Sequence, residues 1–156
     1  MDLLWTTYDI FLRQLFVTGE LKLQIDDIWG MLVSKDYVPD PLNHTHRSHV
    51  SPFGIRGKGY TKGGMPLGGR VVDVRGGLMT LKASPLVWPI ATIRAGGLVF
   101  YKNSGANEVT DVLIQHMSLL NEDEQEAAST NNEFRVDWPE EKGVLQVDFR
   151  AAKAAE

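Results

Sequence analysis

Three of the four histidines lie within six residues, at His44, His46 and His49. Imidazole nitrogens are common ligands of zinc and nickel, and three of them can hold an ion if the chain folds them around one point. However, the segment has no periodicity that would place the rings on one face, no cysteine or glutamate lies nearby, and Arg47 stands between them. We therefore expect exposed loop histidines and no metal site.

Residues 54–64 combine five glycines with Lys58, Thr61 and Lys62. Backbone amides of glycines flanked by cations can cradle a phosphate. A nucleotide-binding P-loop also needs a glycine five residues earlier, a serine or threonine directly after the lysine, and a preceding strand, and these are missing around Lys58. The segment instead predicts a loop with positive φ angles, anchored to the core by Tyr60.

Hydrolase chemistry has no matched set of residues in this chain. There is no Gly-x-Ser-x-Gly sequence, and His116 lies in a predicted strand without an adjacent serine. The carboxylates of Glu122, Asp123, Glu124 and Glu126 stand in a polar run that is typical of solvated surface. A catalytic pair assembled from distant segments is the alternative that stays open. We expect a protein without enzymatic activity, catalytic residues or a cofactor.

The composition predicts the fold that positions these residues. A chain of 156 residues with 43% hydrophobic and 23% charged residues fits one globular domain, residues 1–156. Fifteen glycines and seven prolines at short intervals favour many short strands. The absence of cysteine excludes disulfides, a thiol nucleophile and cysteine-ligated metals. We predict a mainly β, antiparallel β-sandwich-like single domain.

Three segments of this domain are predicted to be something other than strands. Apolar residues at three- and four-residue steps predict an amphipathic helix over residues 1–18, ending before Gly19 and lying as a lid on a sheet. Its interspersed charges exclude a transmembrane span or a signal peptide, so no membrane partner is expected. Prolines and glycines predict a long irregular contact loop over residues 35–69. Residues 150–156 are predicted to be a tail.

The central feature of the predicted sandwich is an antiparallel pair formed by residues 93–101 and 109–116 around a turn at residues 103–107. The period of two in the second strand predicts two faces. One carries Val112, Ile114 and His116, and the other carries Leu113, Gln115 and Met117. Further predictions are a buried strand at 28–33, hairpins of 71–74 with 78–81 and of 134–138 with 144–149, and a surface loop at 121–132.

The aromatic residues have two alternative roles. Trp88 and Trp138 each end an alternating apolar segment before a proline that should stop the strand, which predicts that both are core residues. If Trp29, Tyr37 and these two rings were exposed, they would form the stacking surface of a carbohydrate- or receptor-binding module.

Several short motifs occur in a fixed order along the chain. They are residues 27–34 (Asp-Ile-Trp-Gly-Met-Leu-Val-Ser), 37–40 (Tyr-Val-Pro-Asp) with His44, 57–64 (Gly-Lys-Gly-Tyr-Thr-Lys-Gly-Gly), 87–88, 91–93, 101–102 with Gly105, 113–114, and 134–138 before Gly143. In this order, over residues 3–149, the chain resembles a family of small structural proteins of tailed bacteriophages. Gly96 and Gly97 replace an Arg-Tyr pair often present in that family, so no contact by that pair is expected here.

The resemblance implies a virion component with a β-sandwich-like fold and without a defined site. The function expected is a capsid decoration or cement protein, assembled into the virion in the bacterial cytoplasm. A collar, head–tail connector or tail protein is the alternative. The partners implied are the major capsid protein or collar and tail proteins, and further copies of the chain. We place the predicted contacts on the N-terminal helix and the long loop: Phe11, Leu15, Phe16, Tyr37, Arg56, Lys58, Tyr60 and Lys62.

Charge is distributed unevenly along the chain. Residues 52–82 contain six basic and one acidic side chain, whereas residues 119–156 contain ten acidic and four basic ones. If the two regions lie on different surfaces, one copy can meet the next head to tail, or the basic loop can meet an acidic shell protein. The alternative is that they meet within one monomer. The formal net charge of −4 argues against specific nucleic-acid binding.

Overall fold

The computed structural model describes residues 5–150 and is mainly β, with 42% of the chain in antiparallel strands. The strands are β1 (Trp5–Thr7), β2 (Ile28–Val33), β3 (Met65–Pro66), β4 (Val71–Arg75), β5 (Leu78–Lys82), β6 (Leu86–Ala95), β7 (Gly97–Lys102), β8 (Val112–Ser118), β9 (Ala127–Val136) and β10 (Leu145–Asp148). The helical segments are α1 (Asp9–Arg13), a π-helical turn (Gln14–Thr18) and two 3₁₀ turns (Arg47–His49 and Ser51–Phe53). The predicted fold class is confirmed.

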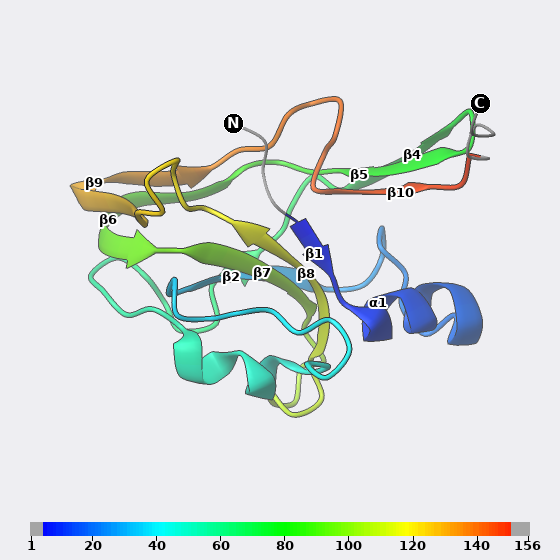
Figure 1. Cartoon of the computed structure of the whole chain (residues 1–156), viewed down its shortest axis with the longest axis horizontal. Helices are drawn as coiled ribbons and strands as arrows, with labels where there is room; N and C mark the ends of the chain where they lie inside the picture. Colours follow the sequence, from blue (N-terminus) through cyan, green and yellow to red (C-terminus); the bar gives the residue numbers. More distant parts are fainter. Residues whose placement is uncertain (1–4, 151–156) are drawn as a thin grey trace.

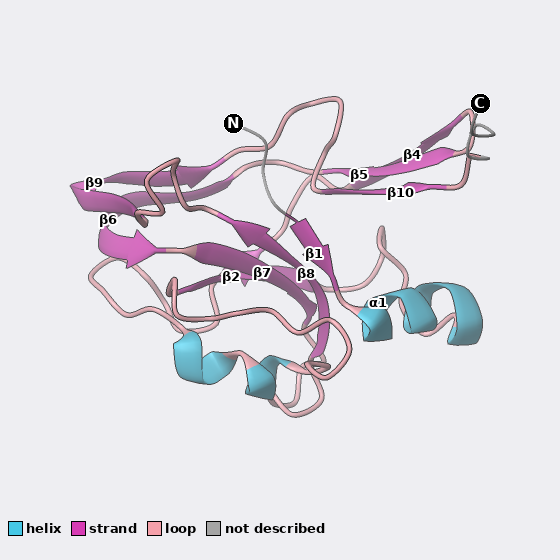
Figure 2. Ribbon diagram, in the orientation of Figure 1, coloured by secondary structure: helices cyan, strands magenta, loops and turns pink. Residues whose placement is uncertain are grey.

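The strands form two layers (Figure 1). One layer is a five-stranded sheet in the order β1-β8-β7-β2-β3. The other consists of two smaller sheets lying end to end, β6-β9 and β10-β5-β4. The 3₁₀ turns and the loops around them lie on the side of the five-stranded sheet that faces away from the second layer (Figure 2). The five-stranded sheet is therefore covered on both faces.

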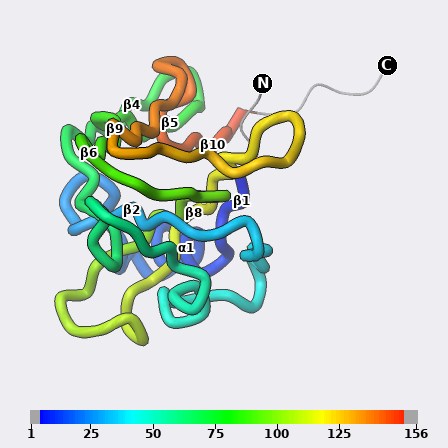
Figure 3. The backbone as a smooth tube through the Cα atoms, turned by 90° about the vertical axis from the view of Figure 1, so that its left-hand side faces the viewer, coloured from blue at the N-terminus to red at the C-terminus, as the bar shows by residue number. Residues whose placement is uncertain are grey.

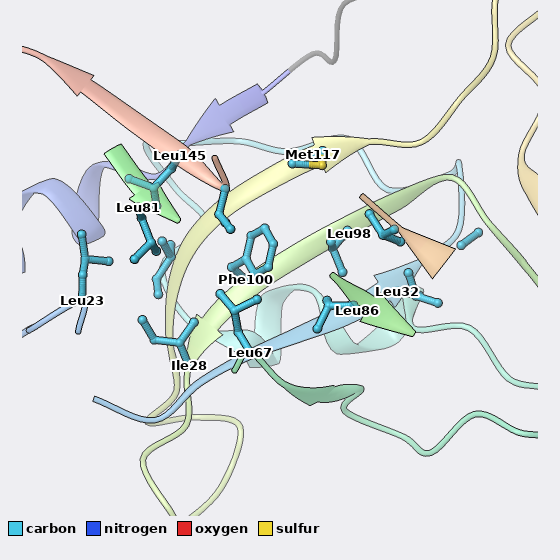
Figure 4. Packing of buried hydrophobic residues seen from close by; sticks show 14 of the residues in the cluster. Leu23, Ile28, Leu32, Leu67, Leu81, Leu86, Leu98, Phe100, Met117 and Leu145 are labelled. Carbon is cyan, nitrogen blue, oxygen red and sulfur yellow. The ribbon is translucent and has the colours of Figure 1, made fainter. Parts of the chain in front are cut away.

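Two hydrophobic cores result from this arrangement. Between the layers, Phe100 of β7 lies at the centre of the first core (Figure 4). Leu81 and Leu145 of the three-stranded sheet lie on one side of the Phe100 ring, and Leu32 of β2 and Leu86 of β6 lie on the other. On the opposite face, a second cluster joins the sheet to the loops that cover it. Its members are Tyr8, Met31, Val33, Tyr37, Val50, Val99, Tyr101 and Leu113. A strand buried on both faces reads as a continuous apolar run, as the predicted strand at 28–33 does.

The predicted central pair is confirmed as β7 and β8, but the predicted faces of β8 are partly wrong. Ile114 is an extra residue, because consecutive residues of β7 oppose Leu113 and Gln115. Beyond this β-bulge, His116 lies on the same face as Leu113, and Met117 returns to the face of Ile114. A bulge inserts one residue into the period of two, and the sequence pattern did not indicate it.

The predicted helix over residues 1–18 is too long at its start. Residues 5–7 form β1, which pairs with β8, and the helical segment begins at Asp9. Trp5 and the two threonines after it favour a strand, and the edge of β8 offers them hydrogen bonds. Residues 1–4 lie outside the described part. The predicted end is correct, since Gly19 has a φ of +70°.

The predicted terminal hairpin of residues 134–138 and 144–149 is wrong. β9 pairs with β6, and β10 pairs with β5 in a different sheet. β6 is ten residues long and continues through Pro89, because a register shift between Trp88 and Ala91 accommodates the proline. β9 begins at Ala127, so the predicted surface loop at 121–132 ends at Glu126.

Two glycine-containing connections complete the sheets. The hairpin of β4 and β5 is confirmed, with Gly76 and Gly77 at positive φ in its two-residue turn. The predicted strand-like run 93–101 is split at Gly96, where the chain passes from β6 to β7 and changes layers. A side chain on Gly96 would collide with the backbone of Lys35, and one on Gly97 with His116. These contacts leave no room for a larger side chain at either position.

Candidate functional site

A cavity of about 770 Å³ lies between β2 and residues 47–63. Arg47, Arg56 and Lys62 line it together with Met31, Ile55 and Tyr60, and its described lining contains no acidic side chain. The apolar residues form part of the wall beside three cations. We call this cavity the basic pocket. A site of this composition favours an anion that carries some apolar surface.

The glycines of residues 54–64 shape one wall of the basic pocket. Gly59, Gly63 and Gly64 have positive φ angles, as the sequence predicts for this loop. Gly64 lies directly on the backbone of Gly30 in β2, so a Cβ at this position would overlap the Gly30 carbonyl group. The loop therefore approaches the sheet more closely than any other residue type would permit.

Tyr60 anchors this loop, as predicted. Its hydroxyl oxygen accepts a hydrogen bond from the backbone N–H of Leu32 at 2.9 Å, and its ring packs against Trp88 with the centroids 5.8 Å apart. Burial raises the pKa of Tyr60 to about 12, so the hydroxyl stays protonated. This contact ties the pocket to both layers of the sandwich.

Arg47 is the most rigidly held cation of the pocket. Its Nε donates to Oδ2 of Asp111 at 2.7 Å, and its guanidinium group lies over the ring of Tyr101, 5.1 Å from the centroid. The Tyr101 hydroxyl in turn donates to the carbonyl oxygen of Gly63 at 2.6 Å. Asp111 is 1% exposed and also accepts from the backbone N–H and the hydroxyl of Ser104, each at 2.7 Å.

The free donors of Arg47 give the pocket its chemistry. Within residues 5–150, its two terminal nitrogens have no hydrogen-bond partner, although Nε is fully engaged. Such a fork matches the two oxygens of a carboxylate or a phosphate. Arg56 and Lys62 are exposed beside it. The pocket can therefore bind an anionic group with a pre-oriented guanidinium.

The sequence pattern indicated only part of this site. Arg56, Tyr60 and Lys62 were predicted contact residues and line the pocket, whereas Arg47 and Asp111 were missed. The two are 64 positions apart, and β8 brings them together only because the bridge between His46 and Val112 aligns the two segments. The one sequence feature that could have indicated a paired charge is the position of Asp111 directly before an apolar strand.

Two of the clustered histidines, His44 and His49, brace the loop. Only His49 is exposed as predicted, whereas His44 and His46 are half-buried. Within residues 5–150, no group of three histidine or carboxylate side chains is arranged to hold a metal ion. Nδ1 of His44 accepts from the backbone N–H of Asp40 at 3.2 Å and lies 3.0 Å from the Tyr37 hydroxyl. Nδ1 of His49 accepts from the backbone N–H groups of Thr45 and His46 at 3.1 and 3.3 Å.

The predicted contact residues differ in how much surface they offer. Phe11 and Tyr37 are buried within the chain, so neither ring is available to a partner. Leu15 and Tyr60 are half-buried. Phe16 is 50% exposed and meets Phe149 edge to face, and Arg56, Lys58 and Lys62 are exposed. That the exposed residues meet a partner stays a prediction.

The four rings proposed for a stacking platform do not form a common exposed surface. Trp88 and Tyr37 are buried, and Trp29 and Trp138 are half-buried. Trp138 donates its Nε1–H to the carbonyl oxygen of Ala83, and Trp29 donates to Asp27. A carbohydrate-stacking surface made of these rings is therefore not present. Within residues 5–150, no helix has the length and apolar character needed to cross a bilayer.

His116, beside the second core, predicts a pH dependence of stability. Burial lowers the pKa of His116 from 6.5 to about 4. Between these values the unfolded chain binds a proton that the folded chain excludes, so stability falls as the pH decreases from 6.5 to 4. The expected loss is about 3 kcal/mol. Urea unfolding at a series of pH values from 7 to 4.5 measures it.

The variant His116→Leu should remove most of this slope, because leucine does not titrate. Burial also lowers the pKa of His46, so a residual slope in the same direction is expected. An unchanged slope in the variant would contradict the assignment to His116.

No protein-family model, curated protein or solved structure matches the chain.

Proposed function

We propose that this chain is a non-enzymatic structural protein of a tailed phage particle, bound in many copies to the outside of the capsid. The observation that carries the proposal is where the motifs of the phage resemblance lie. Residues 28–33 of the first motif form β2, and residues 57–64 lie against this strand through Gly64 and Tyr60. Both motifs contribute to the lining of the basic pocket, the first through Met31 and the second through Gly57, Tyr60, Lys62 and Gly63, together with residues 47–56.

The form of the molecule supports a role in binding other proteins. Both faces of the five-stranded sheet are closed by the chain itself, so its interior is filled by side chains. The exposed features include the basic pocket and large apolar side chains such as Phe16 and Phe149. Surfaces of this kind, on a fold closed by its own loops, suit assembly against neighbouring proteins.

Quantitative mass spectrometry of purified phage particles tests the proposal. A cement protein is expected at hundreds of copies per particle. A collar, connector or tail protein would be present at about six to twelve copies, because such assemblies adopt closed rotational symmetry. Absence of the chain from particles that contain all other structural proteins would overturn the proposal.

A further inference from the structure

The β8–β9 loop carries a compact acidic group. Glu122, Asp123 and Glu124 are all exposed there. Asn121 braces the turn, because its side-chain oxygen accepts from the backbone N–H groups of Asp123 and Gln125 at 2.9 and 3.0 Å. The loop projects from the molecule in Figure 3, where it is drawn in yellow. The three carboxylates are therefore presented on a shaped, protruding turn, which we call the acidic turn.

Neither the acidic turn nor the exposed cations of the basic pocket are neutralised within the described part of the chain. Within residues 5–150, Glu122, Asp123 and Glu124 take part in no ion pair, and neither do Arg56 and Lys62. Glu126, at the base of the turn, is different: it accepts from the backbone N–H of Lys35 at 3.0 Å. Within residues 5–150, one chain thus offers an acidic projection without ion pairs and a pocket in which Arg56 and Lys62 are also without them, beside the paired Arg47.

We propose that the acidic turn of one copy enters the basic pocket of a second copy, with a turn carboxylate bound by Arg47, Arg56 and Lys62. The free terminal nitrogens of Arg47 supply two parallel donors for this carboxylate. The two surfaces are different parts of the chain, so the contact is heterologous, and repeating it produces a closed ring or an open stack. This contact between copies does not require the proposed location in a phage particle.

The geometry favours contact between copies over contact within one copy. Arg56 and Glu126 both line a second hollow of about 510 Å³. However, the Glu126 carboxylate accepts a hydrogen bond from the backbone N–H of Lys35, and its Oε1 lies 3.9 Å from Nε of Arg94. The acidic turn is braced by Asn121 and stays exposed, outside the lining of the basic pocket. The carboxylates of the turn are therefore available to a neighbour.

Sedimentation velocity of the full chain, at concentrations up to about 1 mM and at low and high salt, tests the proposal. The wild type should self-associate, and added salt should weaken the association because the contact is electrostatic. The pocket variant R56E/K62E and the turn variant E122K/E124K should each weaken it by about tenfold or more. The control K22E/K142E changes the charge of two exposed lysines outside the pocket and should associate like the wild type.

Mixing the two charge-reversed variants gives the decisive result. The acidic turn of R56E/K62E fits the unchanged pocket of E122K/E124K, and the reversed turn of the latter fits the reversed pocket of the former. An equimolar mixture should therefore recover association that neither variant has alone, which misfolding of either variant could not produce. A wild type that stays monomeric at low salt, association unaffected by both variants, or a mixture without recovery would each overturn the proposal.

Discussion

Replacing Trp88 with alanine is expected to lower the free energy of unfolding by about 3–5 kcal/mol. The ring is only 5% exposed and lies between Tyr60 and Phe134, with centroid distances of 5.8 and 6.0 Å. The substitution leaves a cavity between β6 and the loop that Tyr60 anchors, so both the core and one wall of the pocket lose support. Chemical unfolding followed by circular dichroism measures the loss.

Trp138 is the natural comparison for Trp88. It is half-buried at the margin of the same core, and its Nε1–H reaches the Ala83 carbonyl oxygen at 3.1 Å. Since less apolar area leaves water at this position, Trp138→Ala should cost less than Trp88→Ala. An unchanged unfolding midpoint for Trp88→Ala would mean that the ring is exposed in solution, and it would restore the stacking-platform interpretation.

Replacing Asp111 with asparagine is expected to destabilise the chain by about 3–5 kcal/mol. The carboxylate is buried, and it holds Arg47 and Ser104 in place. Asparagine has the same shape, but an NH₂ group replaces one of the two carboxylate oxygens. If this NH₂ group faces Arg47, two donors oppose each other, and if it faces Ser104, the hydrogen bond from the Ser104 N–H is lost. In either case Arg47 keeps a largely buried charge without its anion. Urea unfolding at neutral pH measures the effect.

The pair of Asp148 and Arg150 supplies a matched control. A terminal nitrogen of Arg150 lies 2.7 Å from Oδ2 of Asp148, the same distance as in the Arg47–Asp111 pair, but both side chains are about half exposed. Water already solvates these charges, so Asp148→Asn should leave the unfolding free energy without a measurable change. If Asp111→Asn and Asp148→Asn had equal effects, burial would not be what makes the Arg47–Asp111 pair important.

Self-association and the Asp111 variant address the same pocket from different sides. If Asp111 orients Arg47 for a carboxylate of a second copy, Asp111→Asn should also weaken association under conditions where the variant is folded. The charge-reversed variants leave Arg47 and Asp111 unchanged, so their effects report on the exposed rim of the pocket. Comparing Asp111→Asn with the charge-reversed variants separates the effect of orienting Arg47 from the effect of the charges at the pocket rim.

Local sequence determined several of the strands and turns. Residues 28–33 are a strand because they form a continuous apolar run, and the turn at Gly76 and Gly77 forms because both positions need a positive φ. The end of the helical segment at Gly19 and the open backbone of residues 59–64 follow from glycine in the same way. These features depend on interactions within a few residues, which a sequence pattern records directly.

Only the tertiary structure decided which strands meet and which charges pair. Alternating residues in 134–138 and 144–149 indicate that each strand has a buried face, but they do not identify the strand with which each one pairs. In the structure, β9 pairs with β6 and β10 pairs with β5. The bulge at Ile114 likewise depends on the register between β7 and β8. Arg47 and Asp111 form the centre of the basic pocket although 64 positions separate them. Periodicity records burial, whereas pairing depends on contacts that exist only after the chain has folded.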